Sequence, residues 1–301
     1  MTDDIAALAE RIPELRGIAE PPQRLGGLTN RVYRCGPLVL RFPGAGTEAY
    51  IDRRNEAEAA RIAAAAGVSP EVIHADPATG IMVTRFVEGA VTMSPAAFRS
   101  RPGSPARAGA AFARLHAART PFPFTFELFA MIDSYLRVLS GRDVALPPGY
   151  HDVVAEAAGI RAALAARPLP SVPCHCDPLC ENFLDTGERM FIVDWEYSGM
   201  NDPMWDLGDL SVEGQFDDDQ DMEMLVAYFG GDPAPADHGR MVIYKAMCDL
   251  LWTLWGLIQL SDGNPADDFR AYADGRFARC RALMATSAFG RHLEAVARHA
   301  G

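Results

Sequence analysis

The chain has 301 residues, and its 28 lysines and arginines against 40 aspartates and glutamates give a formal net charge of −12. Hydrophobic residues make up 49% and charged residues 23%, which is the balance of a folded globular protein and excludes an intrinsically disordered chain. The excess of negative charge argues against a nucleic-acid binder, because no basic surface would neutralise a row of phosphates. The same charge is compatible with a small cationic ligand.

We expect no segment of the chain to enter a membrane. Residues 1–10 contain three acidic residues and no apolar run, so they do not have the pattern of a signal peptide. The most apolar stretch, residues 250–260, is shorter than the roughly 20 residues of a membrane span. The cysteines do not resemble a disulfide framework in a chain of this size, which predicts reduced thiols and a cytoplasmic location. They are Cys35, Cys174, Cys176, Cys180, Cys248 and Cys280.

The first part of the chain has the pattern of a small sheet with one helix. Residues 23–43 combine a Gly-Gly turn with alternating apolar residues, which predicts β-structure. Residues 48–66 are rich in Ala, Arg and Glu and are followed by Gly67, which predicts a helix with a glycine stop. Two further strands are expected at 71–75 and 81–87, on either side of a turn-forming segment.

After Glu88 the sequence pattern changes from mixed strands and helix to mostly helix. This change predicts an N-terminal lobe of residues 1–88 and a C-terminal lobe of residues 89–301. The elements expected in the second lobe are a helical region, a β-like island and a second helical region, at 104–167 (broken at 146–149), 172–194 and 203–301. The sequence therefore predicts an α+β protein: a small mixed lobe hinged to a larger, mostly helical lobe that carries one inserted hairpin.

The residues that carry chemistry gather around the β-like island. Asp177 and Asn182 lie five residues apart in a short loop, and Asp194 ends the apolar strand that follows. Phosphoryl transfer needs a carboxylate that orients and deprotonates the attacking hydroxyl, together with oxygen ligands for the Mg²⁺ on the nucleotide phosphates. The two motifs in this order predict a phosphoryl-transfer site.

Two alternatives apply to the same residues. In the first, the aspartates are ordinary turn residues and strand caps. In the second, the loop binds zinc through Cys174, His175, Cys176 and Cys180. The spacing disfavours zinc, because three adjacent residues in an extended backbone cannot all face one ion and the sequence has no second C-x-x-C pair.

Four segments resemble the choline/ethanolamine kinase family, a branch of the aminoglycoside-phosphotransferase-like enzymes. They are residues 25–33 (LGGLTNRVY), 83–89 (VTRFVEG), the 175–182 loop and residues 194–198 (DWEYS). The loop is typical of the wider superfamily, and the DWEYS run is typical of the choline kinase branch. Because the matches extend over residues 24–280, the resemblance implies a bilobal protein-kinase-like fold whose small lobe has an antiparallel sheet.

The resemblance also implies roles for the residues around the loop. Asp177 would be the catalytic base, and Asn182 and Asp194 would bind Mg²⁺. His175 and Asp206 would brace the loop.

In the small lobe, the resemblance implies an ATP site. A turn would cover the phosphates with its backbone N–H groups, which suits the close approach that glycine permits. A hinge segment would offer backbone groups to adenine. The residues are Gly26, Gly27, Leu28, Thr29 and Asn30 in the turn, and Phe86, Val87 and Glu88 in the hinge.

The cation that grips the phosphates is expected to be arginine. Protein kinases place a lysine on the third strand, but the single lysine of this chain, Lys245, follows both aspartates. Arg41 stands at the strand position, choline kinases resemble this in using arginine, and a guanidinium offers phosphate a planar fork of donors. Glu56 is its expected ion-pair partner, with Glu58 as the alternative.

Aromatic residues in the C-terminal lobe predict the substrate side. Trp252 and Trp255 share one helix face, and Tyr272 follows in a pattern that resembles the family's quaternary-ammonium cage. Glu213, seven residues after Asp206, is the expected carboxylate of this cage, and Tyr197 is expected to contact the substrate or the loop. The alternative is that these aromatics are ordinary core residues.

The sequence thus predicts an ATP- and Mg²⁺-dependent phosphotransferase that acts on the hydroxyl of a small cationic alcohol, most simply choline. The alternatives on the same fold are kinases of ethanolamine, thiamine or an aminoglycoside. An aminoglycoside enzyme would be expected to have a carboxylate-rich pocket rather than paired tryptophans. A catalytically silent binding protein is the alternative outside enzymes, and the intact Asp177, Asn182 and Asp194 argue against it.

Overall fold

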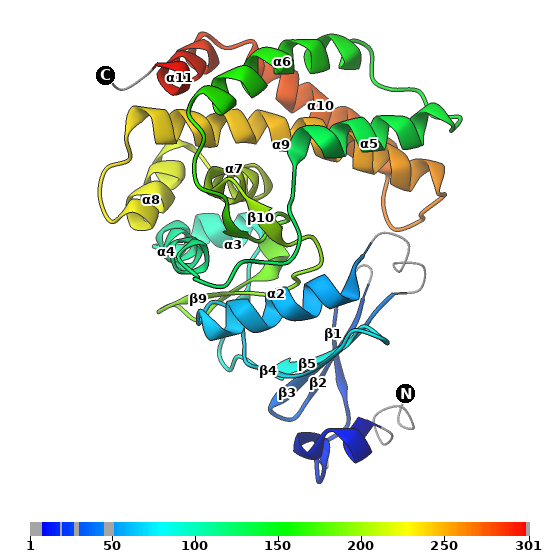
Figure 1. The fold of residues 1–301 in the computed structure, drawn as a ribbon. Helices are drawn as coiled ribbons and strands as arrows, with labels where there is room; N and C mark the ends of the chain where they lie inside the picture. The colour runs from blue at the N-terminus through cyan, green and yellow to red at the C-terminus, as the bar shows by residue number, and fades with distance from the viewer. Residues whose placement is uncertain (1–7, 19, 27–29, 45–50, 299–301) are drawn as a thin grey trace.

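The computed structural model of the chain describes residues 8–18, 20–26, 30–44 and 51–298, and it has two parts (Figure 1). The N-terminal part holds a five-stranded antiparallel sheet with one helix, α2, lying across it. The C-terminal part is mostly helical and carries two small sheets. This arrangement confirms the predicted α+β class.

The N-terminal sheet has the strand order β1-β2-β3-β5-β4. On the middle strand, Leu38, Leu40 and Phe42 are buried on one face, where Leu8, Ile12 and Leu15 cover them. Arg41 lies on the opposite face, toward α2, where its guanidinium reaches a carboxylate of that helix. The strands are β1 (Gln23–Gly26), β2 (Arg31–Cys35), β3 (Leu38–Phe42), β4 (Val72–Asp76) and β5 (Ile81–Arg85).

Helix α2 (Arg53–Ala65) is shorter at its start than the predicted helix over 48–66. Asp52 explains the difference, because its carboxylate accepts the N–H groups of Arg54 and Asn55 and caps the helix there. Of the predicted helix, residues 48–50 lie outside the described residues. The helix ends where predicted, before Gly67 at φ +72°.

The C-terminal helices are organised around α9 (Pro235–Ser261), which packs against α5, α7, α10 and α11 (Figure 1). In the described part of the chain, α9 is the one helix that could cross a membrane by length and composition. Its most apolar window is 83% buried inside the protein, as in a core helix. The other helices are η1 (Pro13–Leu15), α3 (Pro95–Ser100), α4 (Ser104–His116), α5 (Leu128–Ser140), α6 (Tyr150–Ala166), η3 (Cys180–Asn182), α7 (Pro203–Gly214), α8 (Asp218–Phe229), α10 (Phe269–Met284) and α11 (Ser287–Ala297).

The β-like island forms two small sheets rather than the one predicted hairpin. The hairpin of β8 and β9 gains a third strand, β6, and β7 pairs separately with β10. The prediction missed β6 and β10 because strands of two or three residues are too short to show alternation. The strands are β6 (Val91–Thr92), β7 (Val172–Cys174), β8 (Phe183–Asp185), β9 (Met190–Ile192) and β10 (Gly199–Asn201).

Candidate active site

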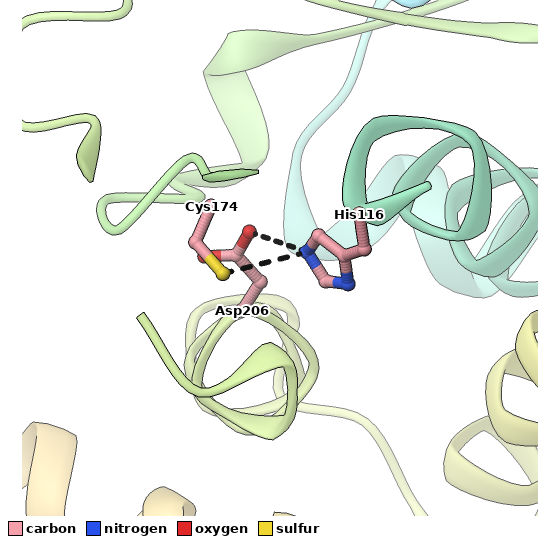
Figure 2. A group of neighbouring side chains, drawn as sticks. All are labelled: His116, Cys174 and Asp206. Carbon is pink, nitrogen blue, oxygen red and sulfur yellow. Dashed lines mark hydrogen bonds and ion pairs between the residues drawn. The ribbon is translucent and has the colours of Figure 1, made fainter. Parts of the chain in front are cut away.

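The loop after β7 is held by the buried carboxylate of Asp206, in the first turn of α7. Its Oδ2 accepts the N–H of His175 at 2.7 Å, and its Oδ1 accepts the N–H of Cys176 at 2.8 Å. Cys176 has φ +68°, a conformation that residues with a side chain seldom adopt. Figure 2 shows His116 turned toward the same carboxylate, with Nε2 3.0 Å from Oδ2. Asp206 therefore stabilises the strained backbone at the start of the loop.

The side chains of the zinc alternative do not gather around one point. In the described part of the chain, the metal-ligand types that converge beside the loop are His116, Cys174 and Asp206, within 4.8 Å of one another (Figure 2). Only Cys174 belongs to the four residues of that alternative. Both oxygens of Asp206 already accept loop N–H groups, so this cluster is explained by its hydrogen bonds.

Asp177 lies half-buried in the loop among other carboxylates. Its backbone carbonyl accepts a hydrogen bond from Nδ2 of Asn182 at 3.1 Å, which ties the two motif residues together. Burial, followed by the charges of Glu213 and Asp194, raises the pKa of Asp177 to about 8, while Arg276 acts in the opposite direction. A carboxylate with a raised pKa is a stronger proton acceptor than an ordinary aspartate.

His175 connects the loop to the strand that leads to Asp194. Its Nε2 donates to the carbonyl of Val193 at 2.9 Å, and its ring meets the edge of Trp195 with centroids 4.9 Å apart. Burial lowers the pKa of His175, so the ring is held neutral, with one N–H that serves this bond.

Arg41 joins the sheet to the end of that strand. Its Nη1 donates to Asp194 Oδ1 at 3.2 Å and to Glu196 Oε1 at 3.1 Å, and its Nη2 pairs with Glu56. A second arginine, Arg53, donates through Nη1 to Glu56 Oε2 at 2.9 Å and to Glu196 Oε1 at 2.7 Å. Two arginines and two glutamates thus form a closed buried box, with Asp194 at its edge.

The box resolves the choice of partner for Arg41. Glu56 faces Arg41, whereas Glu58 is exposed and lies 4.0 Å from Arg61. Asn30, from the predicted phosphate turn, also reaches the box, because its Nδ2 donates to Glu196 Oε1 at 2.9 Å.

Three carboxylates meet at this point: Asp194 is the most exposed of them, and Glu56 and Glu196 are already paired with Arg41 and Arg53. Oxygens of Glu56, Asp194 and Glu196 lie within 4.8 Å of one another, and hard cations such as Mg²⁺ prefer oxygen ligands. Asn182 is joined to the segment before Asp194 through its backbone, because its carbonyl accepts the N–H of Val193 at 2.9 Å. Burial first, then the charge of Glu196, raises the pKa of Asp194, and Arg41 opposes the shift. A bound cation would favour the ionised carboxylates.

Part of the predicted nucleotide site can be described. Gly26 ends β1, and Asn30 contacts Glu196 as above, while Gly27, Leu28 and Thr29 lie outside the described residues. In the predicted hinge, Phe86 donates its N–H to the carbonyl of Pro37 at 2.8 Å. Arg34 lies over the Phe86 ring at 3.8 Å and donates to Glu88 at 2.6 Å. The carbonyl of Val87, between them, accepts the N–H of Ala90 at 3.4 Å.

The four predicted substrate aromatics form a continuous row. The ring centroids lie 5.8 Å apart between Tyr197 and Trp252, 6.4 Å between Trp252 and Trp255, and 5.7 Å between Trp255 and Tyr272. All three contacts are edge-to-face. Trp252 is 4% exposed and has a core residue's burial, whereas the other three are half-buried. Burial raises the pKa of Tyr272, and the charge of Asp177 adds to this, so the row lies near the expected base.

Glu213 lies near Asp177 but is already paired. Arg276 of α10 forms an ion pair with Glu213, and its Nη1 also donates to Asp249 at 3.2 Å. The same guanidinium lies over the Tyr272 ring at 4.7 Å. The carboxylate expected to face a substrate cation is therefore neutralised from within the protein.

Three residues of this site escaped the sequence analysis: Arg53, Glu196 and Arg276. Two of them could have been found from the sequence, because they lie inside motifs that resemble the family. Glu196 stands two residues after Asp194 in the DWEYS run, and Arg276 lies four residues after Tyr272. Arg53 had no such signal, because charged residues are common on exposed helices and only the packing shows that this one is buried.

The fold and this arrangement define the class of protein. The chain matches the model of the phosphotransferase enzyme family over residues 22–241, and it belongs to that family. A choline/ethanolamine kinase family protein from Mesorhizobium loti is 69% identical, with 98% of this chain and 99% of that chain covered and a TM-score of 0.92. Within the phosphotransferases, the chain is therefore a member of the choline/ethanolamine kinase family.

More distant relatives carry more specific names. The choline kinase LicA from Streptococcus pneumoniae is 25% identical, covers 94% of this chain and 99% of its own, and has a TM-score of 0.76; LicA has also been solved with AMP. Ethanolamine kinase 1 of Mus musculus is 25% identical over 83% of this chain and 80% of that protein.

Proposed function

We propose that the protein transfers the γ-phosphoryl group of ATP, with Mg²⁺, to the hydroxyl of choline. The observation that carries the proposal is that residues 193–197 contact three parts of the site. The N–H of Val193 donates to Asn182, Asp194 and Glu196 pair with Arg41, and Tyr197 begins the aromatic row. Arg41 would hold the phosphates, and Asn182 and Asp194 would bind the metal. Asp177 would accept the hydroxyl proton as the oxygen attacks phosphorus.

The aromatic row supports a cationic acceptor. A quaternary ammonium has no N–H to donate, so aromatic faces and a nearby negative charge hold it better than hydrogen-bond acceptors do. Tyr197, Trp255 and Tyr272 are half-buried, which keeps their rings within reach of a ligand. The name of the S. pneumoniae relative agrees with choline, and the name of the mouse relative makes ethanolamine the second candidate.

A panel assay tests the proposal. ATP consumption is followed with choline, ethanolamine, thiamine and kanamycin at equal concentrations, with and without Mg²⁺. We expect choline to have the largest kcat/KM and ethanolamine to be second. Greater activity with thiamine or kanamycin than with choline would overturn the proposal. If ATP is not consumed with any of the four compounds, a catalytically silent binding protein would be favoured.

A further inference from the structure

A buried carboxylate, that of Asp209, lies between α7 and α9 beside Trp252 of the aromatic row. Asp209 is 1% exposed, and its Oδ2 accepts a long hydrogen bond of 3.4 Å from Nε1 of Trp252. Its Oδ1 is buried and accepts no N–H or O–H from the described residues, and the thiol of Cys248 is a weak donor beside this carboxylate. Burying an ionised carboxylate without a paired cation is costly, so a positive charge from outside the chain would stabilise it even without an N–H to donate.

The surroundings of Asp209 are those of the acceptor site. Burial, followed by the charges of Glu213 and Asp177, raises the pKa of Asp209 well above its ordinary value. Arg276 and the weakly donating thiol of Cys248 act in the opposite direction. Asp209 also adds to the raised pKa of Tyr272, so it is electrostatically coupled to both the expected base and the aromatic row.

The acidic side chains in this region outnumber the arginines that could pair with them. Two guanidinium groups, those of Arg276 and Arg279, are both used: Arg276 pairs with Glu213 and Asp249, and Arg279 pairs with Asp249. Among the described residues, neither Asp177 nor Asp209 has an arginine, lysine or histidine within ion-pair distance. Because Asp177 is expected to receive the hydroxyl proton, Asp209 is the carboxylate left for a cation.

We infer that Asp209, beside Trp252, supplies the negative charge that neutralises the ammonium group of the substrate. Glu213 instead holds Arg276, which lies over Tyr272 and so fixes one side of the site. The inference rests on the proposed function, since it takes a cationic alcohol as the acceptor. It assigns the charge recognition to a residue of α7 that touches the aromatic row directly.

The test compares a charged ligand with its neutral isostere in the same variant. Binding of choline and of 3,3-dimethylbutan-1-ol, which replaces the ammonium nitrogen with carbon, is measured by calorimetry for the parent protein and for Asp209→Asn. The amide keeps an acceptor for Trp252 and removes the charge. We expect choline binding to weaken about tenfold or more, because one desolvated charge contact is lost. Binding of the neutral alcohol should stay the same or improve.

Asp221→Asn is the matched control, because Asp221 is equally buried but already bonded to Lys245 and Ser211 on the far side of α7. It should leave the ratio of the two affinities unchanged. If Asp209→Asn does not fold, as judged by its melting temperature and by nucleotide binding, Asp209→Ser takes its place, with a hydroxyl for Trp252.

The outcomes separate this inference from the proposed function. If Asp209→Asn binds choline as the parent does, or loses choline and the neutral alcohol equally, Asp209 is not the charge partner. If the parent protein neither binds nor phosphorylates choline or ethanolamine, the proposed function itself fails, whatever the variant does.

Discussion

Asp177 is surrounded by carboxylates, and this environment decides how it can act as a base. With only the chain's own groups present, burial and the charges of Glu213 and Asp194 keep its pKa near 8. Cations on either side, a metal on the phosphates and an ammonium at Asp209, would let it ionise. In the proposed function, Asp177 would therefore become an effective proton acceptor once both substrates are bound.

Asp177→Asn should leave nucleotide binding within about twofold of the parent and lower kcat by about a hundredfold to ten-thousandfold, because the hydroxyl loses its proton acceptor. Steady-state kinetics and a nucleotide-binding titration measure the two quantities. Near-normal turnover in this variant would remove Asp177 from the role of base.

Arg41 lies between Glu56, Asp194 and Glu196, which fix its guanidinium in place, and in the proposed function it would hold the phosphates of ATP. Arg41→Ala should raise the KM for ATP and lower kcat, with a combined loss in kcat/KM of about tenfold to a hundredfold, since a charge-assisted contact is worth about 1.5–3 kcal/mol. Arg41→Lys should recover only part of the lost kcat/KM, because the ammonium is a point charge whereas the guanidinium offers a planar fork of donors. Kinetics equal to the parent's in Arg41→Ala would show that another cation holds the phosphates.

At the scale of elements, a buried carboxylate helps to attach the sheet of β6, β8 and β9 to the helices, beside the contacts of Phe183 with Phe98 and Phe112. Asp185 at the end of β8 is buried, and burial alone would raise its pKa. Hydrogen bonds from Arg107 and Arg101, with the N–H of Gly187, outweigh burial and lower the pKa of Asp185 to about 2. The ion pairs thereby join β8 to the first turn of α4 and the segment before it.

A lowered pKa in the folded state means that this carboxylate stabilises the fold above the ordinary aspartate pKa and loses its effect as the pH falls toward 2. Asp185→Asn should therefore lower the free energy of unfolding by about 2 kcal/mol at pH 7, with the difference from the parent shrinking between about pH 4 and pH 2. Urea unfolding at several pH values measures it. A difference that grows as the pH falls would contradict the assignment.

Helices α7 and α9 approach closely at Gly208, next to Asp209. A Cβ there would lie 2.7 Å from the carbonyl oxygen of Met241 and 2.9 Å from Cβ of Tyr244. Gly208→Ala should destabilise the protein by about 1–3 kcal/mol and weaken choline binding, because it separates Asp209 from Trp252. Gly159→Ala is the control: that glycine, within α6, has open space, so the change should stabilise by about 0.5–1 kcal/mol. The melting temperatures of the two variants are compared with that of the parent. Equal shifts would refute the close approach of α7 and α9 at Gly208.

At the scale of the whole molecule, the sequence predicts what is local and misses what is brought together by the fold. The loop with Asp177 and Asn182 and the strand before Asp194 are contiguous motifs, so they could be found without coordinates. The contact between Arg53 and Glu196 joins residues 143 positions apart, and that between Asp209 and Trp252 joins residues 43 apart. No local pattern distinguishes such charges from solvated ones.

The same long-range contacts tie the two parts of the chain into one unit. The N–H of Ile192 donates to the carbonyl of Val68 at 2.7 Å, and Nδ2 of Asn55 donates to the carbonyl of Ser198 at 2.9 Å. A single buried cluster also runs from α2 into the C-terminal helices. Loss of the N-terminal sheet would therefore expose the core beneath α2, so we expect the whole chain to unfold in one step.

The tryptophans make this testable, because all four lie in the C-terminal part: Trp195, Trp205, Trp252 and Trp255. Unfolding in urea followed by tryptophan fluorescence should coincide with unfolding followed by circular dichroism, which reports on both parts. A nucleotide that binds Arg41 in the N-terminal sheet, at 100 times its Kd, should stabilise both signals equally, by about 2.7 kcal/mol. If the nucleotide shifts the circular dichroism transition and leaves the fluorescence transition in place, the two parts unfold separately. The contacts at Val68 and Asn55 would then be too weak to couple the ATP side to the aromatic row.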